Sequence, residues 1–363
     1  CRFYAEKAEE FLAPVSHTSD GSEAWVRYDS IGPVLAIMPW NFPFWQVIRF
    51  AAPTLMAGNT GLLKHAPNTP RCAELIEELF QKAGFPEGVF QNLRLTNEQA
   101  ASVIADPRVA GVTLTGSTRA GRVVAGKGGE GLKPMVMELG GSDPFLVFED
   151  ADISKALAVG STSRILNNGQ SCIAAKRIIV EDAVHDAFVQ RLQAAIEALN
   201  VGDPAQDTTD IGPMARRDLL DALHGQVERS VAQGAQCLVG GKAPADGCLY
   251  PPTLLVGLDA TMAAFKEETF GPVAAVARVK DAQEAIALAN QTDYGLGAAI
   301  WTSPERGAAL APQIQAGNVT INGFVKSDPR LPFGGIKNSG MGRELGPWGL
   351  MEFVNVKTVW VGR

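Results

Sequence analysis

Short apolar runs alternate with helical segments along most of this chain, and that alternation limits the fold more than any other feature. Residues 33–38 (PVLAIM) form a continuous apolar run, as a strand buried in a parallel sheet does. Residues 46–57 predict a helix and NTGLLKHAP a second strand. A further helix is expected to start at Thr69, as N-cap, and to end at Gly84. The pattern predicts an α/β fold in which an open parallel sheet carries helices on its faces.

The same alternation continues towards the C-terminus. VAGVTLTG, PMVMELGG and residues 174–180 are expected to be strands, and STRAGRVVAGKG, DISKALAVGSTSRIL and residues 183–199 to be helices. After residue 200 a polar connection precedes expected strands near 236–240 and 273–279 and a helix near 281–290. EAWVRYD (23–29) and the C-terminal FVNVKTVWVGR are also predicted to be strands.

Composition excludes several classes of protein. A chain of 363 residues allows two or three packed units. The net charge of −7 and the lack of a basic run argue against a nucleic-acid partner. Five cysteines without a CxxC pair, and four histidines without HExxH, predict no metal site. So few cysteines favour a cytoplasmic protein over a disulfide-bonded one.

No membrane partner is expected. The most apolar stretch, PVLAIMPWNFPFWQVIRFAAPTLMAGNTGLL, is interrupted by prolines, Asn41 and Arg49, so it does not suit a bilayer span. The chain opens at Cys1 within a helical pattern, CRFYAEKAEEFL. We therefore expect further residues to precede it.

Two motifs suggest nucleotide binding. LTGSTRAG places Gly116 and Ser117 at a strand-to-helix turn, where backbone N–H groups attract phosphate. It is not GxGxxG, and an ordinary tight turn explains it equally well. In EETFGP, the carboxylate could hold a ribose and Phe270 could back a flat heterocycle. The alternative is a charged turn with a core phenylalanine.

Three further residues are candidates for catalysis. Glu138, in MELGGSDP, ends a buried strand and could be a general base, although a surface turn is locally the simpler interpretation. Asn41, between the two prolines of PWNFP, could donate to an oxyanion or could satisfy its own loop. Cys172, in NGQSCIAAK, has small polar neighbours that suit an accessible thiol better than a packed one.

Taken in order along the chain, these motifs resemble one family. PWNFP, the later Lys64, TGST, ELGG, GQSC, EETFGP and PFGG resemble the aldehyde dehydrogenase superfamily, and the spacing from Glu138 to Cys172 also fits. The resemblance runs from about residue 3 to the end of the chain. Family members normally carry a further N-terminal part that includes the first units of the cofactor domain.

The resemblance implies a covalent mechanism. Cys172 would attack the aldehyde carbon, and the Asn41 amide and the backbone N–H of Cys172 would hold the oxyanion. Glu138 would activate water to hydrolyse the thioester that follows hydride loss. Glu344, in GRELG, resembles a second acid of the family and is an alternative base.

The resemblance also implies NAD or NADP as cofactor. Lys64 and Glu268 would hold the two riboses, and Gly116 and Ser117 would meet the pyrophosphate. NAD-preferring members usually have an acid where this chain has Pro67, so NADP should be accepted. The positions that match cofactor-binding residues are Trp40, Lys64, Pro67, Gly116, Ser117, Leu139, Glu268 and Phe270.

The implied substrate is succinate semialdehyde. Arg49 and Ser327 match positions that bind the substrate carboxylate in succinate-semialdehyde dehydrogenases, and the chain most resembles a bacterial-type subgroup of these. A second arginine usually found there is replaced by Leu166, and Arg164 is expected to point elsewhere. For Arg49 the alternative is a structural salt bridge. General aliphatic aldehydes, or transfer of the thioester to coenzyme A, are alternative functions.

The expected architecture follows the resemblance. Residues 1–140 would form a cofactor-binding domain with an oligomerisation strand near 17–30, residues 141–335 an α/β catalytic domain, and residues 336–363 a C-terminal segment. Strands 23–29 and 353–361 would pair into a β arm. Because an exposed ribbon leaves strand edges open, a homodimer or homotetramer is expected. A cysteine hydrolase and a non-catalytic protein are the remaining alternatives.

Overall fold

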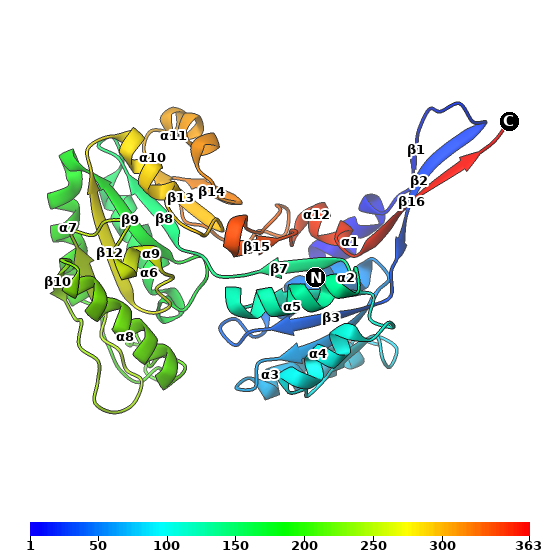
Figure 1. Ribbon diagram of the computed structural model, residues 1–363, viewed down its shortest axis with the longest axis horizontal. Helices are drawn as coiled ribbons and strands as arrows, with labels where there is room; N and C mark the ends of the chain where they lie inside the picture. The colour runs from blue at the N-terminus through cyan, green and yellow to red at the C-terminus, as the bar shows by residue number, and fades with distance from the viewer. The chain divides into compact units, whose positions relative to one another are not determined.

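The computed structural model describes residues 1–363 and contains three β-sheets (Figure 1). The chain separates into two units. Unit 1 comprises Cys1–Leu139, Ser327–Gly334 and Gly340–Arg363, and unit 2 comprises Gly140–Lys326 and Gly335–Ser339. Unit 1 therefore includes residues 327–334 and 340–363, whereas the expected map placed 327–335 in the catalytic domain and 336–363 in a separate segment.

Unit 1 is built on a six-stranded sheet of order β15-β7-β6-β3-β4-β5, in which only β15 is antiparallel to its neighbour. Its strands are β3 (Pro33–Met38), β4 (Thr60–His65), β5 (Phe90–Asn92), β6 (Gly111–Thr115), β7 (Met135–Glu138) and β15 (Gly340–Met341). The mainly parallel sheet predicted from the apolar runs is confirmed.

Alternation of side chains along each strand supplies both faces of this sheet. Val34 and Ala36 pack on one face with helices α2 (Trp45–Met56) and α3 (Pro70–Lys82). Leu35 packs on the other face with residues of α4 (Asn97–Ala105) and α5 (Thr118–Glu130). The expected N-cap position of α3 is confirmed. Thr69 stands at the N-cap of α3, but its hydroxyl bonds to Ala66 and His65 and does not cap the helix.

Unit 1 also carries a β ribbon, which projects from it in Figure 1. Strand β2 (Glu23–Ser30) pairs antiparallel with β16 (Val354–Val361) along its whole length, and β1 (Val15–Ser16) pairs with the other edge of β2. The predicted pairing of the C-terminal strand with residues 23–29 is thus confirmed. Helices α1 (Arg2–Phe11) and α12 (Gly346–Met351) pack near the base of β16.

Unit 2 has a seven-stranded sheet of order β10-β11-β12-β9-β8-β13-β14, with β10 alone antiparallel. Its strands are β8 (Asp143–Val147), β9 (Ala175–Glu181), β10 (Gln236–Val239), β11 (Thr253–Val256), β12 (Val273–Val279), β13 (Gly297–Trp301) and β14 (Asn318–Ile321). Strands β8, β11, β13 and β14 were not predicted.

Helices cover both faces of this second sheet. One core includes residues of α8 (Arg217–Ala232) and α10 (Ala282–Asn290), and the other includes residues of α6 (Ile153–Ile165) and α7 (Asp182–Glu197). Helix α8 was not predicted either. The remaining short elements are α9 (Ala263–Lys266), α11 (Pro304–Leu310) and the 3₁₀ turns η1 (Leu166–Gly169), η2 (Ala311–Gln313) and η3 (Lys337–Ser339). None of the helices has the length and apolar character needed to cross a membrane.

Candidate active site

Four predicted residues of unit 1 lie at one edge of its sheet. Strands β3, β4, β6 and β7 run parallel, so their carboxyl ends share an edge. Asn41 follows β3, Lys64 lies at the end of β4, Gly116 follows β6, and Glu138 ends β7. In open α/β sheets this edge is the usual place for ligands. The topology therefore gathers residues that are far apart in the sequence.

The loop that carries Asn41 is held by two buried side chains. Gln46, in the first turn of α2, donates a hydrogen bond from Nε2 to Asn41 Oδ1 at 3.3 Å. His65 Nε2 lies 3.0 Å from the carbonyl oxygen of Pro43. This hydrogen bond orients the Asn41 amide, with Oδ1 as the acceptor towards Gln46.

A pocket of about 370 Å³ lies beside the predicted cofactor residues. Lys64 and Arg119 line it, together with apolar side chains such as Ile37 and Leu114. Burial lowers the pKa of Lys64. An apolar pocket with three cations at its wall, Lys127 being the third, fits a nucleotide base with an anionic group attached.

The turn from β6 into α5 is open to a ligand. Ser117 caps α5 by accepting a hydrogen bond from the backbone N–H of Ala120 at 3.3 Å. A Cβ at Gly116 would come no closer than 3.6 Å to any protein atom in its surroundings, so packing does not require glycine there. The space that a side chain would fill is open to the backbone of the turn, as close approach of a ligand would require. Trp40 is half-buried and Pro67 is exposed on the loop after β4.

Leu139 contributes to packing. Its side chain is 7% exposed, and a Cβ at Gly121 would lie 2.5 Å from it. Helix α5 therefore packs closely on the end of β7. Any contact of Leu139 with a cofactor would have to use its backbone.

Glu138 is buried, so the simpler interpretation of a surface turn is wrong. It is 2% exposed, and burial together with the nearby Glu344 carboxylate raises its pKa well above the usual range, against the opposing charges of Arg49 and Arg343. The PFGG motif packs on it: a Cβ at Gly334 would lie 2.7 Å from Glu138 Oε1. A carboxylate with a raised pKa is suited to take up a proton.

Arg49 forms a buried ion pair with Glu344. Arg49 Nε lies 2.5 Å from Glu344 Oε2, and the two side chains are 4% and 6% exposed. The guanidinium also stacks over the ring of Phe333 at 4.8 Å. Ser327, the second predicted substrate residue, is half-buried in the loop after β14. Arg49 is therefore already bound by a carboxylate of the chain itself.

In unit 2, Cys172 follows a tightly anchored turn. Asn167 and Asn168 adopt left-handed conformations (φ 55° and 54°), which asparagine tolerates better than most residues. Asn168 Oδ1 accepts the backbone N–H of Gly212, and Gln170 Oε1 accepts that of Ala215. Cys172 itself is half-buried, between this turn and β9, as an accessible thiol would be. No disulfide involves any of the five cysteines.

Arg164 has a structural role, as expected from its position on a helix. It is buried, and its guanidinium donates to the carbonyl oxygens of Gly169 and Gly271, both at 2.8 Å. It thereby joins the turn before Cys172 to the segment after Phe270. Leu166 is 47% exposed at the start of η1.

Glu268 and Phe270 lie close to a lysine that sequence reasoning missed. Lys176 Nζ lies 2.6 Å from Glu268 Oε1 and 5.7 Å from the centre of the Phe270 ring. The backbone N–H of Gly141 also donates to Glu268 Oε1, at 3.1 Å. The Glu268 carboxylate is thus oriented by the protein.

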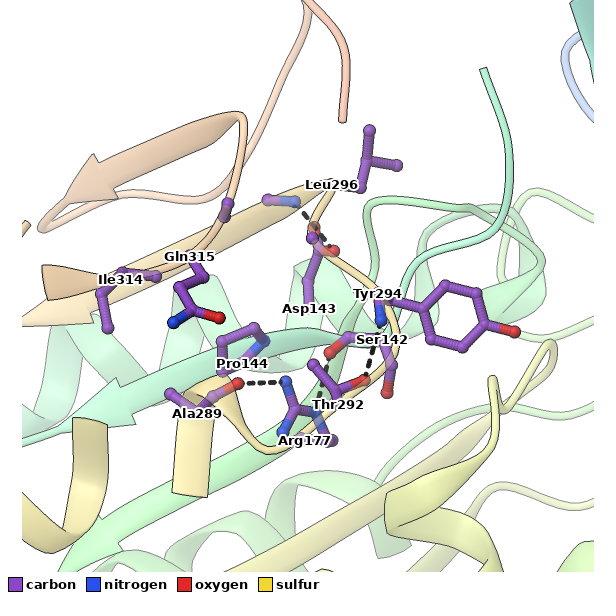
Figure 2. A pocket seen from close by; sticks show the side chains of 13 residues that line it. Ser142, Asp143, Pro144, Arg177, Ala289, Thr292, Tyr294, Leu296, Ile314 and Gln315 are labelled. Atoms are coloured by element: carbon purple, nitrogen blue, oxygen red, sulfur yellow. Dashed lines mark hydrogen bonds between the residues drawn. The ribbon is translucent and has the colours of Figure 1, made fainter. Parts of the chain in front are cut away.

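A small cavity in unit 2 is lined by Asp143 and Arg177, among other residues (Figure 2). Asp143 is 3% exposed and accepts the backbone N–H of Gly297 through Oδ1 at 3.1 Å. Burial raises its pKa to about 7, against the charges of Lys176 and Arg177. Arg177 is fully buried and donates to the carbonyl oxygens of Ser142, Leu288 and Ala289.

Gln46, His65 and Lys176 were all missed by sequence reasoning. Each contacts a predicted residue or its loop, and although Lys176 and His65 stand within quoted segments, no role was assigned to any of the three. The lysine left a signal, because a strand as apolar as AAKRIIV rarely carries a charge unless it is paired. No comparable pattern in the sequence points to Gln46 or His65.

The parallel sheets, the pocket and the half-buried cysteine on its anchored turn are the features expected of a nucleotide-dependent α/β enzyme. A model described as "Aldehyde dehydrogenase family" matches residues 1–359. The chain belongs to the aldehyde dehydrogenase family.

Named relatives agree with this assignment. The chain is 55% identical, over 99% of its length and 80% of the relative's, to a Synechocystis protein named "Probable succinate-semialdehyde dehydrogenase [NADP(+)]". It is 48% identical to an Escherichia coli succinate semialdehyde dehydrogenase [NAD(P)+], over 100% of this chain and 79% of that one. The succinic semialdehyde dehydrogenase of Streptococcus pyogenes, solved in complex with NADP+, superposes with a TM-score of 0.96 at 39% identity, covering 99% of this chain and 80% of that one.

Proposed function

We propose that this protein oxidises succinate semialdehyde to succinate with NADP or NAD as the hydride acceptor. The observation that carries the proposal is a buried, protonatable Glu138 in a chain of this family that also presents Cys172 on an anchored turn. The names of the relatives support succinate semialdehyde as substrate.

The chain's own residues account for the steps. The Cys172 thiolate adds to the aldehyde carbon, and the Asn41 amide and the Cys172 N–H stabilise the oxyanion. A bound nicotinamide cofactor supplies the acceptor for the hydride that leaves this carbon. The resulting thioester is attacked by water, whose proton passes to Glu138, and the thiolate is released as the acid forms.

The residues present fit a nicotinamide dinucleotide. Lys64 and the oriented Glu268 carboxylate would hold the riboses. The open space beside the Gly116 backbone would admit the pyrophosphate. Pro67 offers no carboxylate to repel a 2′-phosphate, and Arg119 lines the same pocket as Lys64.

The role of Arg119 in cofactor choice can be measured directly. Arg119→Glu should raise KM for NADP by roughly tenfold or more, because a charge-assisted contact becomes a repulsion. KM for NAD should change little. Arg122→Glu, on the same helix, controls for a general loss of positive charge. An equal rise in both KM values would mean that Arg119 does not read the 2′-phosphate.

The substrate is tested by comparing succinate semialdehyde with butanal, a neutral aldehyde of equal chain length. In the wild type we expect kcat/KM to favour the charged aldehyde by about 10- to 100-fold, the effect of one charged hydrogen bond. Arg49→Met should abolish that preference, whereas the surface variant Arg71→Met should keep it. Equal use of both aldehydes would reduce the proposal to a general aldehyde dehydrogenase. A preference that survives Arg49→Met would place carboxylate recognition elsewhere, with Arg49 serving only to pair Glu344.

A further inference from the structure

Lys176 is a fully buried lysine that the proposed mechanism does not use. It lies in β9, four residues after Cys172. Its ammonium group donates to the carbonyl oxygen of Gly141 at 2.5 Å, to that of Cys172 at 2.9 Å and to Glu268 Oε1 at 2.6 Å. A lysine has three N–H donors, and here each has an acceptor.

The three acceptors come from three separate segments of unit 2. They are the glycine pair of ELGG, the turn that carries the nucleophile, and the EETFGP segment. These segments are in close contact: a Cβ at Gly140 would lie 2.3 Å from Glu268 Oε2, and one at Gly141 would lie 2.6 Å from the Cys172 carbonyl oxygen. The glycine pair is therefore needed for the segments to close around the ammonium group.

Stability alone does not explain a charge in this position. Removing a lysine and a carboxylate from water is costly, and apolar residues of similar volume often stabilise a core as well or better. Strand β9 is buried along its whole length, so an apolar residue would suit position 176. The role of the Lys176 charge therefore lies in the three groups that accept its hydrogen bonds.

We propose that Lys176 is a positioning residue, which fixes the Glu268 carboxylate and the Cys172 backbone in one geometry. The inference rests on the proposed function, in which Glu268 binds the cofactor ribose and Cys172 is the nucleophile. Glu268 Oε1 accepts both Lys176 and the Gly141 N–H, so Oε2 is the oxygen left to accept a ribose hydroxyl. Lys176 thus links cofactor binding to the placement of the nucleophile.

The first test is Lys176→Met, with Lys280→Met, an exposed lysine of the same unit, as the matched control. The Kd for NADP+, measured by tryptophan fluorescence of the folded protein, should rise roughly 5- to 20-fold in Lys176→Met, since an oriented charged partner is lost. It should be unchanged in Lys280→Met. A Lys176→Met protein that melts lower but binds NADP+ as tightly as the wild type would overturn the proposal, since Lys176 would then be structural only.

A double-mutant cycle shows whether Lys176 acts through Glu268. Glu268→Gln should weaken NADP+ binding, and adding Lys176→Met should weaken it little further. If the two effects on Kd multiply, Lys176 does not act through Glu268 and the proposal fails. The double variant leaves no unpaired buried charge, so it should fold even if Lys176→Met alone does not.

The effect of Lys176 on the reactivity of Cys172 is measured in the absence of cofactor and aldehyde. Alkylation of Cys172 by iodoacetamide at pH 7 should be roughly threefold or more slower in Lys176→Met/Glu268→Gln than in Glu268→Gln, because a nearby cation favours the thiolate. Equal rates would overturn this part of the inference. A wild type that binds NADP+ but oxidises no aldehyde would instead contradict the proposed function and leave these comparisons intact.

Discussion

Glu138 has charges of both signs around it, and they determine the pH at which it can act as a base. Burial and Glu344 raise its pKa, whereas Arg49 lowers it. Glu344→Gln removes a like charge, so the acidic limb of the kcat–pH profile should move to lower pH. Arg49→Met should move the same limb to higher pH. The profile is measured from pH 5 to 9 with saturating substrate, and shifts of the same sign in both variants would contradict the assignment of Glu138 as the base.

Asp143 makes stability depend on pH. Its pKa is about 7 in the fold, above its unfolded value, so its protonated form is favoured in the folded state. The stability that it contributes is fully present below about pH 4 and is lost as pH rises through 7, by on the order of 2–4 kcal/mol. Urea unfolding of the wild type should show this decline between about pH 4 and 7, and Asp143→Asn should show a smaller one. An unchanged slope in the variant would assign the decline to another group.

The elements show which parts of the structure the sequence could predict. Strand β3 was predicted with its observed bounds because six apolar residues stand between polar turns. Strands β8 and β13 were missed because DPFLV contains a proline and GAAIW opens with glycine and two alanines, residues that local propensity does not favour in strands. Neighbouring strands, not local propensity, decide such segments.

The candidate site likewise contains residues that the sequence could indicate and residues that it could not. Cys172, Glu138 and Asn41 stand in motifs that the sequence displays, so roles could be predicted for them. Lys176 and His65 were not, because their roles depend on hydrogen bonds to segments that only the fold brings near. Motif spacing identifies groups that react, and tertiary structure is needed to identify those that position them.

His65 connects two loops at the edge of the unit 1 sheet where the carboxyl ends of its parallel strands lie. The backbone N–H of Ala66 donates to Nδ1, which also lies 3.0 Å from the Thr69 hydroxyl, so the ring proton must be on Nε2, facing the Pro43 carbonyl. Burial, and to a smaller extent Lys64, lowers its pKa. The stability that neutral His65 contributes is present above its unfolded pKa of about 6.5 and is lost as pH falls through the folded value.

Two variants separate the contacts of His65. His65→Gln can keep a donor near Pro43, whereas His65→Asn can keep an acceptor near Ala66 but loses the bond to the Asn41 loop. If that bond positions Asn41, kcat should fall several-fold further in His65→Asn than in His65→Gln, consistent with about 1 kcal/mol for one hydrogen bond. Steady-state kinetics at pH 8 measure the difference. Equal kcat values would show that the contact with Pro43 does not affect catalysis.

At the scale of the whole molecule, the proposed roles are divided between the two units. Asn41, Lys64 and Glu138 belong to unit 1, and Cys172 and Glu268 to unit 2. The chain passes from one unit to the other directly after Leu139, within the ELGG motif. Glu138 and Leu139 thus end the first long segment of unit 1, and the glycine pair, which packs on the Cys172 backbone, begins unit 2. Linear domain maps miss this because the residues after 326 return to both units.

The β2–β16 ribbon supports the last prediction, that the protein assembles into a homodimer or homotetramer. Strand β16 is the edge of its sheet, and it exposes Val356 (59%) and Trp360 (53%). Such an apolar edge is a template for pairing with another chain. Val356→Lys/Trp360→Lys should convert the wild-type oligomer to smaller species, because a lysine left unpaired in an interface costs roughly 2–5 kcal/mol.

Light scattering coupled to size exclusion measures the mass of each form. Leu79→Lys, an equally exposed apolar position on α3, serves as the control and should keep the wild-type mass. A double variant that also keeps that mass would show that the ribbon is not the interface. A monomeric wild type would contradict the prediction outright. If the ribbon does hold the oligomer, the double variant should also melt lower and more so on dilution, because assembly stabilises a folded chain in proportion to its concentration.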